Sequence, residues 1–347
     1  MLVDSPPEER SGHASAPPTR RTARALGLLV AVAMLLLVAL ASIAIGAKEL
    51  SLEQVWHGLF HDTGTYGDVV VDQRLSRTVL GLLAGAALGL SGAVLQALTR
   101  NPLADPGLLG INAGASAAVV TAMTFFGVTS LNGYLWFAFA GAAAVGALVW
   151  FLGGSRSATP VRLALAGTAI SAALYGYLQA VMITDDAALG KMRFWTVGSL
   201  ASATDSTIVQ VLPFLASGTV LALLLARPLN AVAMGDDTAR ALGANLNRTR
   251  ALAMLAATVL CGAATAACGP IVFVGLMVPH AVRSFTGPDL RWILPYATVL
   301  SPVLLLGADV LGRVVARPAE LQVGIVTAVI GGPVFIFLVR RRRTAQL

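Results

Sequence analysis

Long stretches without a charged residue recur along the whole chain. Five of them are close to the ~20 residues that an α-helix needs to cross a bilayer, and they are residues 25–47, 78–99, 163–184, 206–226 and 321–339. Because a backbone surrounded by lipid must satisfy its own hydrogen bonds, such stretches predict membrane-spanning helices.

Two longer uncharged stretches exceed the thickness of one bilayer. Residues 106–155 contain Asn132-Gly133, and residues 251–282 contain a break at Cys268-Gly269-Pro270. Both breaks are typical of turns. We therefore interpret each stretch as two helices joined by a tight turn.

A last, shorter stretch covers residues 292–308. It becomes a full span if Asp309 and Arg313 lie in a polar interior or at the interface. Together, the pattern predicts an all-α polytopic membrane protein with about ten transmembrane helices.

Composition agrees with this interpretation. The chain of 347 residues is 56% hydrophobic and 12% charged, with a mean hydropathy of +0.78, which is too apolar for one water-soluble core. A net charge of +7 could indicate nucleic-acid binding. However, the basic residues lie mainly between the predicted spans, so we expect the lipid bilayer as a partner and no nucleic acid.

The distribution of basic residues predicts the orientation. If the N-terminal tail is cytoplasmic, ten spans place 17 of the 24 Lys and Arg residues on the inner side. The run Arg340-Arg341-Arg342-Arg343 is the strongest anchor, so both termini are expected to be cytoplasmic. Residues 1–24 are rich in Pro, Ser and Arg, which predicts a disordered cytoplasmic tail before a single transmembrane domain over residues 25–343.

The sequence has few residues that could carry out catalysis. It has no phosphate-binding loop of the Walker type, and its only lysines are Lys48 and Lys191. Cys261 and Cys268 lie inside a predicted span, where they are typical small core residues. We expect no enzyme activity, no cofactor and no metal site. A gradient-driven secondary transporter would need ionisable residues within its spans, and Asp309 is the only serious candidate.

A loop on the predicted inner side is more informative. In residues 229–243, Asp236 and Asp237 suit the start of a short helix and Gly243 suits its end. We expect this helix to expose Met234, Ala239 and Leu242. It either rests on its own spans or docks on a cytosolic partner.

This loop resembles the coupling segment of the iron-siderophore, haem and cobalamin ABC importer permeases, the FecCD or BtuC-like family. Met234-Gly235 and Asp236-Asp237 depart mildly from the family pattern Leu-Gly-Glu-Glu. Further segments match the family in order, and they are residues 74–77, 90–96, 99–110, 194–200, 269–280, 308–309 and 320–328. The resemblance covers most of the chain from about residue 74 to 340.

The resemblance implies a type II ABC importer permease in the bacterial cytoplasmic membrane, with residues 25–343 as its permease domain. It implies a second permease subunit in a homodimer or heterodimer, two cytoplasmic ATP-binding subunits that hydrolyse ATP, and an extracytoplasmic substrate-binding protein. The expected cargo is a ferric siderophore. Haem and cobalamin, carried by other members of the family, are the alternatives.

The resemblance also implies two sets of site residues. Arg74, Arg77 and Arg313 match positions that receive carboxylates of the binding protein, although Ser76 replaces the usual proline. Snorkelling of Arg74 and Arg77, and an ion pair of Arg313 with Asp309, are alternative roles. Within a coupling loop at about residues 228–247, the residues that match the ATPase contact are Gly235, Asp236, Asp237, Ala239, Arg240, Leu242 and Gly243.

Overall fold

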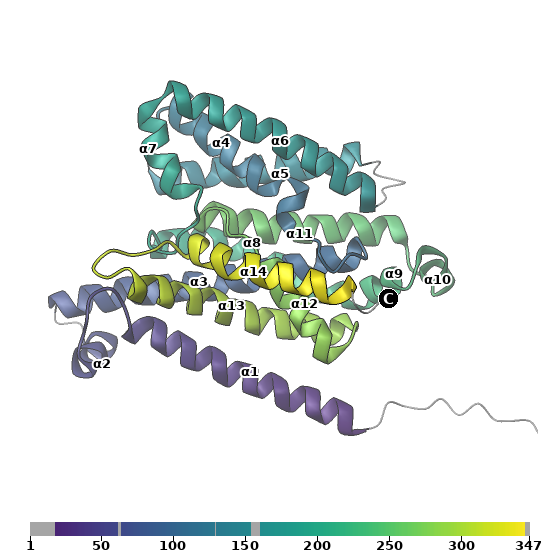
Figure 1. Ribbon diagram of the computed structural model, residues 1–347, viewed down its shortest axis with the longest axis horizontal. Coiled ribbons are helices and arrows are strands. Elements are labelled where there is room, and N and C mark those ends of the chain that lie inside the picture. Colours follow the sequence, from purple (N-terminus) through teal and green to yellow (C-terminus); the bar gives the residue numbers. More distant parts are fainter. Residues whose placement is uncertain (1–17, 62–63, 129, 154–159, 344–347) are drawn as a thin grey trace, which may run out of the picture.

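The computed structural model describes residues 18–61, 64–128, 130–153 and 160–343, and all regular secondary structure in them is helical (Figure 1). In chain order the elements are α1 (Pro18–Ala44), α2 (Leu52–Phe60), α3 (Tyr66–Leu98), the 3-10 helix η1 (Pro106–Leu109), α4 (Ile111–Phe125), α5 (Leu131–Leu152), α6 (Pro160–Thr184), α7 (Asp186–Trp195), α8 (Asp205–Leu224), α9 (Ala226–Ala233), α10 (Asp236–Ala241), α11 (Leu246–Cys268), α12 (Val274–Thr286), α13 (Leu290–Val315) and α14 (Val323–Arg343). The prediction of an all-α protein is confirmed.

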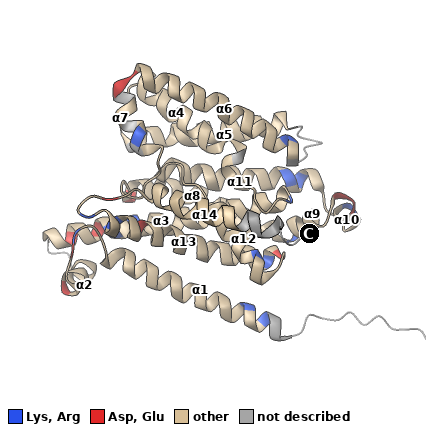
Figure 2. Cartoon of the chain, viewed as in Figure 1, with Lys and Arg blue, Asp and Glu red and all other residues tan. Residues whose placement is uncertain are grey.

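Seven of the described helices are long and apolar enough to cross a membrane, namely α1, α3, α5, α6, α8, α11 and α13. Two more, α4 and α14, contain shorter apolar segments. Charged residues gather towards the two ends of the bundle, and the middle parts of the helices carry few (Figure 2). The chain is thus a multi-pass integral membrane protein. The count of about ten spans stays a prediction.

The two ends of the bundle differ in what they carry. Helices α2 and α7 lie at one end, which we call the α2 end (Figure 1). Helices α9 and α10, the start of α1 and the C-terminal end of α14 lie at the other, which we call the α10 end. The start of the first described helix and the end of the last therefore lie on one side of the bundle. That this side is cytoplasmic stays a prediction.

Helix α3 lies in the interior and packs against α11, α12 and α13, whereas α1 lies on the outside, packs against α13 and buries few of its residues. Small residues allow the close packing. A side-chain carbon at Gly92 of α3 would collide with the carbonyl oxygen of Gly275 in α12, and one at Gly85 would collide with Pro302 in α13. Larger residues at either glycine would force these helices apart, as is typical of membrane helix interfaces.

Both predicted turns within the long uncharged stretches exist. Helix α11 ends at Cys268 and α12 begins at Val274, so the predicted break at Gly269 is confirmed. The other break comes earlier than expected. Ser130 accepts a hydrogen bond from the backbone N–H of Gly133 (3.1 Å) and so caps α5, which places Asn132-Gly133 in its first turn.

Two helices begin before the predicted positions. Helix α1 starts at Pro18, so residues 18–24 of the predicted disordered tail are helical, and residues 1–17 lie outside the described residues. Proline suits the first turn of a helix, where its missing N–H costs nothing. Helix α3 starts at Tyr66, where a capping box between Thr65 and Asp68 fixes its first turn.

Candidate functional site

Arg77, on the α2-end half of α3, lies at the centre of a buried charge cluster. Its Nε donates to Oδ2 of Asp309 (3.0 Å) and its Nη2 donates to Oδ1 of the same carboxylate (2.8 Å). Its Nη1 donates to Oε2 of Glu320 (2.7 Å). The planar guanidinium thus binds two carboxylates that lie far along the chain, and the pair with Asp309 has the bidentate geometry that favours arginine over lysine.

Arg313 binds the same aspartate. Its Nη2 lies 3.0 Å from Oδ2 of Asp309, one helical turn earlier in α13. Its Nη1 donates to the backbone carbonyl oxygens of Ser42 (2.9 Å) and Ile45 (3.1 Å), at the end of α1. Asp309 is 0% exposed and Arg313 is 1% exposed. The intrahelical ion pair expected as one alternative is therefore present.

Arg74 has a different set of acceptors. Its Nη1 donates to the carbonyl oxygens of Ile43 (3.0 Å) and Ala44 (2.9 Å), and its Nη2 donates to that of Lys48 (2.5 Å). The last carbonyls of a helix have no partner within it. Arg74 therefore caps the end of α1. Arg74 and Arg77 are both buried.

The three predicted docking arginines line one small pocket at the α2 end. It has a volume of about 220 Å³, and Glu320, Lys48 and Tyr66 also line it. Glu320 was not among the sequence candidates because 243 residues separate it from Arg77. Its side chain keeps 35% of its surface exposed, against 11% for Arg77, so it forms the accessible part of the cluster.

At the α10 end, the predicted loop helix is present as α10. It begins after Gly235, whose φ of +117° favours glycine, and it is followed by Gly243 with a φ of +76°. The carboxylate of Asp236 accepts a hydrogen bond from Arg100 in the loop after α3. It also accepts two from Nη2 of Arg250 in α11 (2.9 and 2.8 Å). Asp236 therefore ties α10 to the membrane helix α11 and to the loop that follows α3.

These bonds also set the charge of Asp236. Partial burial raises the pKa of its carboxyl, but the hydrogen bonds and positive charges of Arg250 and Arg100 outweigh burial and hold the pKa below its ordinary value of 3.8. Arg100 additionally donates from Nε to the carbonyl oxygen of Val232 (2.9 Å), just before α10. The aspartate is thus ionised at neutral pH and keeps its partners.

The exposed face of this segment differs in one residue from the expectation. Met234 is 67% exposed and Leu242 is 64% exposed, as predicted. The prediction that Ala239 is exposed is wrong, because this residue is fully buried against Val232 and Leu246. A six-residue helix can bury only one narrow face, and here the alanine provides it. On the outside, Arg240 and Asp237 form an exposed i, i+3 pair (2.9 Å).

A second tie joins this segment to α13. Asn230 donates from Nδ2 to Oδ1 of Asp289 (2.7 Å) and accepts from the backbone N–H of Leu290 (2.9 Å), at the first turn of α13. Helix α13 runs from this tie to Asp309 and Arg313 near its other end. One continuous helix therefore connects the segment around α10 with the arginine cluster.

Comparison with known proteins assigns the chain to a family. A model of the FecCD transport family matches residues 34–341. The chain is 49% identical over 315 residues to the ferric enterobactin transport system permease protein FepD of Escherichia coli (strain K12), covering 89% of this chain and 93% of that protein. It is 37% identical over 328 residues to the Fe(3+)-citrate import system permease protein YfmD of Bacillus subtilis (strain 168), covering 94% and 98%.

Two further comparisons extend this result. The chain is 38% identical over 316 residues to the hemin transport system permease protein HmuU of Yersinia pestis, covering 89% of this chain and 94% of that protein. A solved structure, reported as an inward-facing conformation of a metal-chelate type ABC transporter, aligns with a TM-score of 0.80 and 28% identity, covering 91% and 99%.

The fold and these relatives define the class of the protein as a polytopic membrane permease. More narrowly, the chain belongs to the FecCD transport family. Its members are permease subunits of ABC transporters, which are transport components rather than enzymes.

Proposed function

We propose that this chain is the transmembrane permease subunit of an ATP-driven ABC importer that carries a ferric siderophore across the bacterial cytoplasmic membrane. One observation carries the choice of cargo. Identity is 49% with the ferric enterobactin permease, against 38% with the hemin permease over a similar length. Haem and cobalamin are the alternative cargoes within the same function.

The proposed assembly contains two permease subunits, either two copies of this chain or this chain and a similar one. Two ATP-binding subunits lie against the α10 end, and an extracytoplasmic binding protein docks on the α2 end. Residues 25–343 act as one permease domain, and the residues before them form a cytoplasmic tail. The concentration of arginine at the α10 end favours this orientation.

We place the contact with the ATPase on the coupling loop at about residues 228–247. The exposed side chains of Met234 and Leu242 are suited to enter an apolar groove on a partner. Gly235 and Gly243 set the bounds of the inserted helix, while Asp237 and Arg240 lie on its polar surface. Asp236 binds α11 and the loop after α3, so a push on α10 reaches the membrane helices mechanically.

Docking of the binding protein would involve Arg74, Arg77 and Arg313 through the small pocket at the α2 end. All three guanidinium groups already hold internal acceptors. We propose that a carboxylate of the binding protein takes the place of Glu320 on Nη1 of Arg77, since the side chain of Glu320 is partly exposed. Arg77 and Arg313 would then keep Asp309, while Arg77 exchanges Glu320 for the carboxylate of the binding protein.

The test is uptake of three radiolabelled cargoes, ferric enterobactin, haem and cobalamin, in cells that lack the gene and in cells complemented with it. We expect only ferric siderophore uptake to be lost, to return with the wild-type gene, and to stop on ATP depletion. Complementation by a Met234→Ser, Leu242→Ser variant should leave the protein in the membrane and restore no uptake. Loss of haem or cobalamin uptake alone would contradict the proposed cargo, and uptake that survives ATP depletion would contradict the ABC mechanism.

A further inference from the structure

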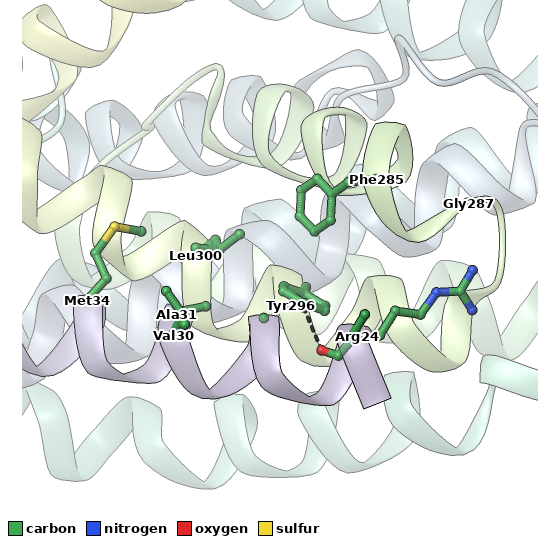
Figure 3. A pocket seen from close by; sticks show the side chains of 10 residues that line it. Arg24, Val30, Ala31, Met34, Phe285, Gly287, Tyr296 and Leu300 are labelled. Carbon is green, nitrogen blue, oxygen red and sulfur yellow. Dashed lines mark hydrogen bonds between the residues drawn. The ribbon is translucent and has the colours of Figure 1, made fainter. Parts of the chain in front are cut away.

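A groove on the outer surface of the bundle lies between α1 and the helices α12 and α13. Its volume is about 700 Å³, within the range of about 300–1,000 Å³ that is typical of ligand pockets. Apolar side chains dominate its lining, including Val30 and Met34 of α1, Phe285 of α12 and Leu300 of α13 (Figure 3). Val30 and Phe285 are more than half exposed, so the groove opens outwards, where lipid surrounds the protein.

The groove is built into the contact between α1 and α13. The hydroxyl of Tyr296 donates to the backbone carbonyl oxygen of Arg24 (2.7 Å), across from one helix to the other. Gly27 makes this approach possible, because a side-chain carbon there would press on the Tyr296 hydroxyl. The inward side of α1 packs on the bundle through residues such as Ala31, which is buried, whereas Val30 on its outward side is exposed. The groove therefore lies along the outer edge of the contact between the two helices.

One end of the groove carries a positive charge. The side chain of Arg24 extends away from the apolar part of the groove at its α10 end, towards Gly287 (Figure 3). Its guanidinium carbon lies 6.0 Å from the centre of the Trp292 ring. None of the ion pairs within the described part of the chain includes Arg24. An arginine and a tryptophan together are typical of the depth at which lipid headgroups lie.

We propose that this groove binds one anionic phospholipid, with its phosphate at the Arg24 guanidinium and an acyl chain along Val30, Met34 and Leu300. The arrangement matches such a lipid at both ends: a charge-assisted bond to phosphate at one end and apolar contact over the remaining length. A lipid with a zwitterionic headgroup would add a second positive charge beside Arg24. The proposal is independent of the cargo and of ATP coupling.

Native mass spectrometry of the full-length protein in detergent tests this proposal, with phosphatidylglycerol or phosphatidylethanolamine added at equal concentration. We expect one retained phosphatidylglycerol, and weaker retention of phosphatidylethanolamine. Arg24→Gln should reduce phosphatidylglycerol retention about fivefold, the factor that corresponds to one basic residue near an anionic lipid surface. Val30→Trp should reduce retention of both lipids, because it fills the apolar part.

The matched control is Arg248→Gln, which removes an exposed arginine at the same end of the bundle outside the groove. It should retain phosphatidylglycerol as the wild type does. Equal retention of the two lipids, or equal loss in Arg24→Gln and Arg248→Gln, would overturn the proposal. A dimer that forms only when Val30 is unchanged, with no lipid retained, would show that a second copy of the chain covers the groove instead.

Discussion

Replacing Asp309 by asparagine should destabilise the protein far more than any exposed charge substitution. The carboxylate is fully buried and holds two guanidinium groups, that of Arg77 and that of Arg313. Asparagine has a similar shape but no charge, and its NH₂ group donates where the carboxylate accepted. Two buried positive charges would then lie together without their shared partner. Removing one member of a buried ion pair typically costs about 3–5 kcal/mol.

Unfolding in mixed micelles, titrated with a denaturing detergent, measures this cost. The matched control is Glu49→Gln, which breaks the pair with Arg317 (2.7 Å) at the same end of the bundle. The side chain of Glu49 is 82% exposed, so the control should lose only ~0–1 kcal/mol. Adding Arg313→Met to Asp309→Asn should recover part of the loss, since it removes one unpaired charge.

A loss of stability in Asp309→Asn within ~1 kcal/mol of the control would refute the reasoning. It would mean that the arginines find other acceptors, or that water reaches the cluster. The same result would also argue against a rigid cluster of Arg77, Arg313 and Asp309 that binds a carboxylate of the binding protein.

Three further predictions concern the α10 end. Met234→Ser with Leu242→Ser should lower co-purification of the ATPase about tenfold or more, as expected for paired interface anchors, without changing the unfolding midpoint of the isolated permease. Asp236→Asn should speed hydrogen exchange in α10 about tenfold at neutral pH, because charge-assisted bonds to Arg100 and Arg250 are lost; since the wild-type pKa is lowered, wild-type protection should persist until the pH falls below 3.8. Burial raises the pKa of Asp105, in the loop after α3, to about 6. The free energy of unfolding should therefore fall as the pH rises from 3.8 to about 6. Asp105→Asn should abolish that fall.

Much of the fold could be predicted from the spacing of charges, because lipid tolerates few of them. The same rule explains the main error. Charged residues at 68, 72, 74 and 77 appeared to end the span before Thr78, yet α3 continues back to Tyr66. Its arginines are satisfied by carboxylates and carbonyls of distant segments. Asp309, the partner of Arg77, lies 232 residues away in the sequence, and no local pattern reveals it.

In the candidate sites too, local features could be predicted from the sequence, and contacts between distant segments could not. Local signals located α10, because Gly235, the two aspartates and Gly243 are neighbours in sequence. The exposed face could not be predicted from them. The burial of Ala239 depends on Val232 and Leu246, which the chain brings together only when α9 and α11 fold against the loop. Glu320 and the carbonyl groups at the end of α1 were missed for the same reason.

Transport by purified components tests the central claim most directly. The permease, its ATP-binding subunit and its binding protein would be reconstituted in liposomes with iron-labelled ferric enterobactin outside. The account predicts accumulation with ATP, none with ADP or with a proton gradient alone, and none with the Met234→Ser, Leu242→Ser permease. Accumulation driven by the gradient without ATP, or equal accumulation by the variant, would contradict it.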